Sequence, residues 1–161
     1  MKRLAYGFSL VELMVVIGII GILAGIAIPQ YRSYIVNAQL VEALTLANEI
    51  QGNINDFYKN RGRFPKNNEQ AGVPEPKYLI GNFVSSIIVS DGAIHVTLGN
   101  KINKQLNGKV LSIRPLVVVG SPTSPISWGC GNSIPPKGME AVGENKTNIE
   151  NVFLTWSCRG G

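Results

Sequence analysis

The chain has 161 residues, a net charge of +5 and two cysteines. This length suits one ordinary domain, and the composition shows neither the bias of a disordered chain nor the repeat of a fibrous one. Lys2 and Arg3 precede a long apolar run, and without them thirteen basic against ten acidic residues leave a charge of +3. So mild a charge indicates simple solubility, and we expect nucleic-acid binding only from a surface built of many copies.

The N-terminal region contains one long apolar segment. Leu13 to Ile28 is unbroken, and extending it back to Phe8 adds only Ser9 and Glu12 as polar residues. About twenty residues with a rise of 1.5 Å cover the roughly 30 Å hydrocarbon layer of a bilayer. The segment therefore predicts a membrane-spanning helix, with the basic leader in front of it held on the cytoplasmic side.

Two alternatives remain open for this segment. One is an ordinary secretory signal peptide, since Gly25-Ile26-Ala27 has the small residues that its cleavage requires. The other is a plain anchor for a periplasmic domain. Glu12 argues against the first alternative, because a carboxylate within an inserted apolar segment costs on the order of 2.5 to 3.5 kcal/mol and needs a partner or a purpose.

The same residues resemble a known family. Lys2-Arg3, then Gly7-Phe8-Ser9-Leu10-Val11-Glu12-Leu13, then an apolar helix ending Ala27-Ile28-Pro29-Gln30-Tyr31 strongly resemble type IV prepilins. The resemblance implies a leader of residues 1–7, cut by a prepilin peptidase between Gly7 and Phe8. It also implies that the Phe8 amine is methylated and that residues 8–30 are retained as a transmembrane and assembly helix.

Glu12 has a physical role in this reading. Cleavage after Gly7 would create an ammonium group at Phe8 within helical reach of the Glu12 carboxylate. Each ion alone in hydrocarbon carries a penalty of several kcal/mol, which pairing largely cancels. In staggered helices, Glu12 of an incoming subunit could neutralise Phe8 of its neighbour. We therefore expect Phe8 and Glu12 to select the axial register of a filament.

A second helical segment follows the apolar one. From Tyr31 to about Arg61 no proline occurs, and Leu40, Ala43, Ala47, Ile50, Ile54 and Phe57 recur at steps of three and four. The polar residues Gln39, Glu42, Glu49, Asn53 and Asp56 fall on the opposite side. We expect this stripe to pack on a sheet, within one helix of about fifty residues and roughly 80 Å.

The rest of the chain predicts an antiparallel sheet. Phe83–Val89 and Ala93–Leu98 flank an Asp91-Gly92 turn, and Lys109–Val119 has similar β-branched content. Ile126–Cys130 and Val152–Cys158 are expected to add a fourth strand and an edge. The fold class is thus α+β, a long helix on a roughly four-stranded antiparallel sheet, with a globular head over residues 31–161. The order of these segments also looks like that of type IVa pilins.

Cys130 and Cys158 predict a disulfide. No C-x-x-C motif or Cys/His cluster suits zinc, and an even pair after an export segment indicates an oxidising compartment. Two reduced core cysteines are the alternative. The enclosed segment, with Pro135-Pro136 and several glycines, reads as an irregular surface loop. Such a loop could contact neighbouring subunits, host surfaces or DNA.

No motif indicates catalysis, and we expect neither a cofactor nor a metal. A Walker A loop, G-x-S-x-G and H-E-x-x-H are all missing, and His95, the only histidine, reads as an exposed strand residue. We therefore expect a structural subunit rather than an enzyme.

The predicted function is assembly into type IV pili for adhesion, twitching motility and possibly DNA uptake. Its partners are other copies in a helical filament, the prepilin peptidase and the pilus assembly machinery. We expect the subunit to lie in the inner membrane before assembly and in an extracellular pilus afterwards. A minor pilin or a type II secretion pseudopilin, and in another class a tethered or secreted periplasmic binding module, are the alternatives.

Overall fold

The computed structural model describes residues 7–160, apart from the side chains of residues 29, 32 and 33. The predicted leader residues Lys2 and Arg3 lie outside this range. The chain divides into two compact units, Met1–Ile35 and Val36–Gly161, and we describe each by itself. The helix α1 (Leu10–Arg61) begins in the first unit and ends in the second, which confirms the predicted long helix.

In the N-terminal unit, α1 is apolar and exposed. The 19 residues Leu10–Ile28 are long and apolar enough to cross a membrane, and none of this segment is buried within the chain. A signal sequence near an N-terminus meets the same criteria of length and composition. Pro29 also lies within α1, and since proline has no backbone N–H, the Gly25 carbonyl receives no helical bond from it.

In the second unit, which we call the head, α1 buries one stripe. Six apolar residues spaced by three or four are at most 4% exposed: Val36, Leu40, Ala43, Ala47, Ile50 and Ile54. The predicted stripe is therefore confirmed, although Phe57 is only half-buried. The helix ends after Arg61, where Gly62 takes a φ of 67° and its N–H donates to the Tyr58 carbonyl at 2.8 Å. A left-handed glycine of this kind is a common helix terminator.

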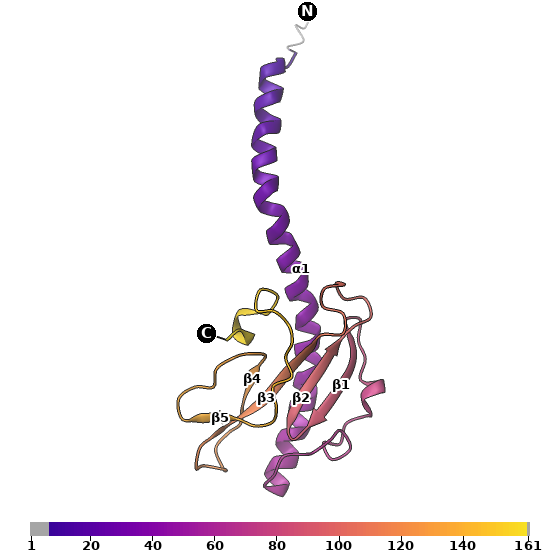
Figure 1. Ribbon diagram of the computed structural model, residues 1–161, viewed down its shortest axis with the longest axis vertical. Helices are drawn as coiled ribbons and strands as arrows, with labels where there is room; N and C mark the ends of the chain where they lie inside the picture. Colours follow the sequence, from indigo (N-terminus) through magenta and orange to yellow (C-terminus); the bar gives the residue numbers. More distant parts are fainter. Residues whose placement is uncertain (1–6, 161) are drawn as a thin grey trace, which may run out of the picture. The chain divides into compact units, whose positions relative to one another are not determined.

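The head contains one antiparallel sheet (Figure 1). The strands β1 (Val84–Ser90), β2 (Ala93–Leu98), β3 (Val110–Val118) and β4 (Ser127–Cys130) are paired in that order, and β5 (Met139–Ala141) pairs with the end of β3. Asp91 and Gly92 both have positive φ, as a two-residue hairpin turn requires. The first four strands lie within one residue of their predicted bounds at the start and end.

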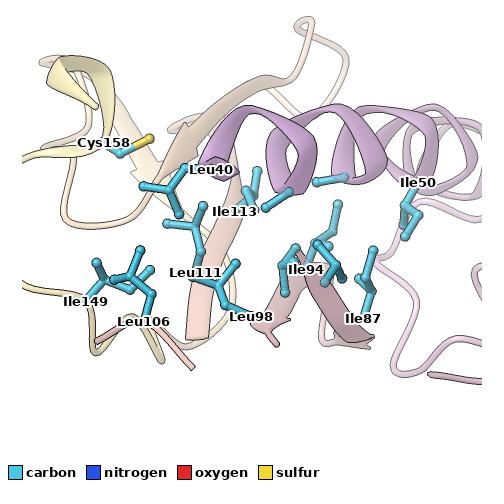
Figure 2. Packing of buried hydrophobic residues seen from close by; sticks show 14 of the residues in the cluster. Leu40, Ile50, Ile87, Ile94, Leu98, Leu106, Leu111, Ile113, Ile149 and Cys158 are labelled. Atoms are coloured by element: carbon cyan, nitrogen blue, oxygen red, sulfur yellow. The ribbon is translucent and has the colours of Figure 1, made fainter. Parts of the chain in front are cut away.

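The core lies between α1 and one face of the sheet (Figure 2). Ile94 is paired with Ile113 and Val96 with Leu111, so these residues share the face toward the helix. All four are at most 2% exposed. At roughly 25 cal/mol per Å² of apolar surface removed from water, this layer is the main favourable term in folding the head.

The prediction that His95 is an exposed strand residue is wrong. His95 is 4% exposed, on the face of β2 that points away from α1. The segment from Gly143 to Ile149 covers that face: the Lys146 N–H donates to Ser112 Oγ at 2.9 Å, and Asn148 Oδ1 accepts from the Val110 N–H at 2.7 Å. The alternation of β2 predicts which side His95 faces, but a distant loop decides whether that side meets water.

The predicted strand over Val152–Cys158 is also wrong. Its first residues form turns, and Trp156–Cys158 is a single turn of 3-10 helix, η2. The prediction of a Cys130–Cys158 disulfide is confirmed. Because the Asn132 N–H donates to the Cys158 carbonyl at 2.8 Å, this segment is fastened to the loop after β4 and adds no strand. The segment predicted as irregular, by contrast, contains β5.

Candidate functional site

The predicted assembly residue Glu12 lies in the first turn of α1. Its carboxylate Oε2 accepts a hydrogen bond from the Ser9 backbone N–H at 2.9 Å, and the Glu12 N–H donates to Ser9 Oγ at 3.2 Å. Ser9 directly precedes Leu10, the first helical residue. The two residues therefore form a reciprocal capping box, in which each side chain satisfies a backbone donor that the helix leaves unpaired.

Ser9 is a residue that the sequence analysis missed. The spacing Ser-x-x-Glu immediately before an apolar run is a signal for a helix start and could have identified it. The cap also explains how a carboxylate is accommodated at this position, because an anion in the first turn interacts favourably with the positive end of the helix dipole. Glu12 thus has a local role in the cap, and its role in assembly stays a prediction.

The predicted cleavage residues lie just before this cap. Phe8 is 84% exposed, and Gly7 is exposed as well. A side chain added at Gly7 would meet no atom within 4 Å. The described structure therefore gives no packing reason for a glycine at residue 7. The Phe8 amine exists only after cleavage, so its distance from the Glu12 carboxylate stays a prediction.

Beyond the cap, α1 exposes a continuous apolar surface. Every large apolar side chain in its first nineteen residues is at least 46% exposed: Leu10, Val11, Leu13, Met14, Val15, Val16, Ile17, Ile19, Ile20, Ile22, Leu23, Ile26 and Ile28. A surface of this size marks contact with a membrane or with another protein. Its apolar residues point in all directions around the helix, as they do in helices that are surrounded by lipid or by other helices.

The buried histidine shows no catalytic arrangement. His95 Nδ1 lies 2.9 Å from Ser112 Oγ, and Nε2 has no hydrogen-bond partner among the described residues. Burial lowers the pKa of His95, Lys146 lowers it further, and Glu144 partly opposes both. Within residues 7–160, no group of three or more His, Cys, Asp or Glu side chains could hold a metal ion.

Two family patterns match the chain. Residues 2–28 match the prokaryotic N-terminal methylation motif, and residues 36–159 match the pilin family of bacterial filaments. The first match contains the predicted cleavage residues and Glu12, and the second covers nearly the whole head. Together they span both units of the structure.

Relatives of known identity align over almost the entire chain. A type IV major pilin protein, PilE1, from Neisseria gonorrhoeae is 36% identical over 99% of this chain and 89% of its own length. A fimbrial protein from Neisseria meningitidis serogroup A is 37% identical over 99% of this chain and 96% of its own length. The fimbrial protein EcpC from Eikenella corrodens is 35% identical over 99% of this chain and 94% of its own length. The chain therefore belongs to the type IV pilin family.

Proposed function

We propose that this chain is a structural subunit of a type IV pilus and polymerises through the apolar part of α1. One observation carries the proposal: the helix over Leu10–Ile28 has no buried residue in its own chain, and Glu12 is the one ionisable residue of that segment. Such a surface requires lipid before assembly and other copies of the same helix afterwards. The subunit accordingly starts in the inner membrane and ends in an extracellular fibre.

The proposed maturation follows the predicted division of the chain. Residues 1–7 form the leader, a prepilin peptidase cuts between Gly7 and Phe8, and the new Phe8 amine is methylated. The match to the N-terminal methylation motif supports this order. Residues 8–30 are then the transmembrane and assembly helix. The predicted globular part over residues 31–161, with the second half of α1, contains the head and the five residues before it.

The capping box adds a step to the proposed electrostatic selection. Before assembly, the Glu12 carboxylate is occupied by the N–H of its own Ser9. A neighbouring Phe8 ammonium is a stronger partner than this N–H, because it adds the attraction between two full opposite charges, which is large where water is excluded. In a wrong axial register the ammonium stays buried and unpaired, which costs several kcal/mol. The charge pair thus favours one stagger between subunits.

Conservative substitutions separate the cap from the charge. Glu12→Gln keeps a side-chain oxygen that can accept the Ser9 N–H, as glutamine does in other capping boxes, but removes the carboxylate charge. Leaving the Phe8 ammonium buried without a partner costs about 3 kcal/mol, so the yield of filaments should fall at least about a hundredfold. Sheared fibres are quantified by electron microscopy against the amount of subunit in the membrane.

The matched controls are Glu49→Gln and Ser9→Ala. Glu49 is an exposed glutamate on the head part of α1, so its substitution removes one carboxylate outside the proposed contact. Ser9→Ala removes the acceptor of the Glu12 N–H and leaves the charge in place. Both variants should form filaments within a few-fold of the unaltered chain. Normal filament yield from Glu12→Gln would refute the charge-matching role.

The mature N-terminus distinguishes a pilin from a conventionally secreted module. Mass spectrometry of the membrane and fibre fractions should find a chain that begins at methylated Phe8. A chain that begins near Ile28 would instead indicate a signal peptide and a periplasmic binding module. Adhesion, twitching motility and DNA uptake are proposed uses of the fibre, with host surfaces and DNA as ligands. Whether this subunit is a major or a minor pilin is decided by its abundance in purified fibres.

A further inference from the structure

One end of the head carries exposed groups that its folding does not use. We call this the Gln39 end, because one of its loops bonds to Gln39, and define it by the exposed side chains of Lys101, Lys104, Val152 and Trp156. Trp156 is 88% exposed and Val152 is 64% exposed, so both apolar side chains are open to a partner. Both lysines are exposed as well. Neither core packing nor the disulfide explains why these four side chains face solvent.

Two loops hold these residues beside the first buried turns of α1 in the head. The loop over residues 99–109 is anchored by buried Ile102 and Leu106, and its Asn103 N–H donates to Gln39 Oε1 at 3.3 Å. In the second loop, η2 buries Cys158 in the core cluster that also contains Leu40 (Figure 2), and leaves Trp156 exposed. Rigid attachment on both sides places the lysines and the tryptophan at the same end of the head.

The opposite end of the sheet is far along α1. The Gly92 N–H in the β1–β2 turn donates to the Pro65 carbonyl at 2.9 Å, after the end of α1. At the Gln39 end, by contrast, the Phe83 N–H donates to Glu42 Oε1 at 3.0 Å. Within the head, one end therefore lies near the first residues of its part of α1, and the other lies near the residues after Arg61.

Chain length limits how far Val36, where the head begins, can lie from the bilayer when the apolar segment is inserted. Val36, the first buried residue of the head, is eight residues after Ile28, the last residue of the spanning segment. Eight residues reach at most about 29 Å when fully extended and about 12 Å when helical. This limit holds for any orientation of the head. Tyr31 and Tyr34, both exposed, lie between the two points and are typical of the membrane–water interface.

The charge of this region suits anionic lipid. The loop over residues 99–109 contains the three basic residues Lys101, Lys104 and Lys109 and no carboxylate. Arg159 is a further cation beside Trp156, whereas Glu150 is the exposed carboxylate on the segment that carries Val152. Lysine and tryptophan together are a common pairing at lipid headgroups, because the ammonium attracts phosphate and the indole ring prefers the interface.

We propose that, before assembly, the Gln39 end of the head docks on the anionic headgroups of the membrane in which the helix is inserted, through Lys101, Lys104 and Trp156. This inference rests on the proposed membrane anchoring and adds a second contact to it. Docking limits the orientations of the head while the subunit waits for assembly, and extraction into a filament breaks it. It also removes Trp156 and Val152 from water at the stage when no neighbour covers them.

The two tryptophans of the chain make the docking measurable. Trp128→Phe leaves Trp156 as the only tryptophan, and the full chain is reconstituted in vesicles of phosphatidylcholine alone or mixed with an equal part of phosphatidylglycerol. In the anionic vesicles Trp156 should be shielded from acrylamide and quenched by a nitroxide on the lipid headgroup. Both effects should disappear as salt shortens the Debye length to about 3 Å.

Paired variants assign the effect to the two lysines. Each lysine near an anionic surface contributes about fivefold in binding, so Lys101→Gln with Lys104→Gln should weaken docking about 25-fold and restore acrylamide access. Lys137→Gln is the control. Lys137 is exposed, and the carbonyl of the next residue, Gly138, accepts a hydrogen bond from the Val119 N–H after the far end of β3. In Trp156→Phe the remaining fluorescence comes from half-buried Trp128, and its quenching should not depend on lipid charge. This variant also leaves the packing at residue 128 unchanged.

Equal acrylamide access to Trp156 in both kinds of vesicle would overturn the proposal. So would an equal effect of Lys101→Gln with Lys104→Gln and of Lys137→Gln, since that would indicate unspecific charge. Release of the whole chain from the vesicles by an alkaline wash would instead show that the anchoring itself fails, and the docking with it. A chain that stays in the vesicles while Trp156 remains accessible refutes the docking alone.

Discussion

At the scale of single residues, two polar groups occupy places where they need specific partners. Glu12 lies at the start of an apolar helix and is held by the Ser9 N–H. His95 lies in the head, and Ser112 Oγ, which accepts the Lys146 N–H, can donate its own proton to His95 Nδ1. That arrangement leaves the imidazole proton on Nε2, which has no partner among the described residues. A buried donor without an acceptor costs about 1 to 3 kcal/mol, and a charge there costs more.

The pH dependence of stability should therefore report on His95. Its pKa in the folded chain is lowered mainly by burial, with Lys146 adding to the shift and Glu144 opposing it. Unfolded chains then bind a proton at a higher pH than folded ones, so the free energy of unfolding falls as pH drops below about 6.5 and levels off below the folded pKa. Above the unfolded pKa of about 6.5, the stabilisation from the neutral imidazole is fully present.

Urea unfolding of the full chain in detergent, at about pH 8 and about pH 5.5, measures this slope. His95 is the only histidine, so His95→Gln should remove most of the decrease between these two conditions. Lys146→Gln should make the decrease smaller, because it removes a cation near the ring. An identical decrease in His95→Gln would show that other groups cause it.

At the scale of elements, the hairpin between β1 and β2 depends on its two-residue turn. Asp91 has a φ of 48° and Gly92 a φ of 85°. Glycine adopts this left-handed conformation without strain, and it also leaves room for a neighbour. A Cβ at residue 92 would lie 2.8 Å from three atoms of the Phe64 side chain. The turn thus links the sheet to the chain that leaves α1.

Two glycine-to-alanine substitutions should have opposite signs. Gly92→Ala should destabilise the head by at least about 1 to 2 kcal/mol, from the positive φ alone, with the contact to Phe64 added. Gly52→Ala, within α1 and with no atom near the added Cβ, should stabilise it by up to about 1 kcal/mol. Urea midpoints of the full chain measure both. A Gly92→Ala variant as stable as the parent would contradict the assigned turn.

At the scale of the whole molecule, the head is closed by the bond between Cys130 and Cys158. Cys158 is 1% exposed, within the core cluster, while the segment between the cysteines includes β5 and the cover over His95. The bond therefore restrains a long, weakly structured segment that contributes to burying the outer face of the sheet. The predicted role of this segment in recognition stays a prediction.

Loss of the disulfide should lower stability substantially. The two cysteines are 28 residues apart, and closing such a loop is worth about 3 to 4 kcal/mol on the chain-entropy model. The double substitution Cys130→Ser with Cys158→Ser should lower the free energy of unfolding by this amount or more, because Cys158 also packs in the core, and the urea midpoint of the full chain should fall accordingly. Reduction of the unaltered chain is the matched control and should give a similar shift. An unchanged midpoint in both cases would show that the bond adds no stability.

Much of the structure follows from local pattern in the sequence. The helix over Leu10–Arg61, its buried stripe and four strands follow from periodicity, because a period of 3.6 or 2 determines which side chains share a face. The N-terminal motif by itself located the predicted cleavage and assembly residues, since Gly7, Phe8 and Glu12 lie within one short segment. Ser9 was missed, although its spacing from Glu12 carries the signal.

What the sequence by itself determined is the long helix, its buried stripe and the first four strands, since these depend on neighbours within a few residues. The chemistry at the N-terminus stays a prediction. Only the tertiary structure decided that His95 is buried, that η2 replaces a predicted strand and that Trp156 is exposed at the Gln39 end. The physical reason is the same in each case. Burial and pairing depend on distant segments of the chain, 34 residues apart for Lys146 and Ser112 and 64 for Asn103 and Gln39. Loops such as Gly143–Ile149 have no periodicity that predicts where they pack.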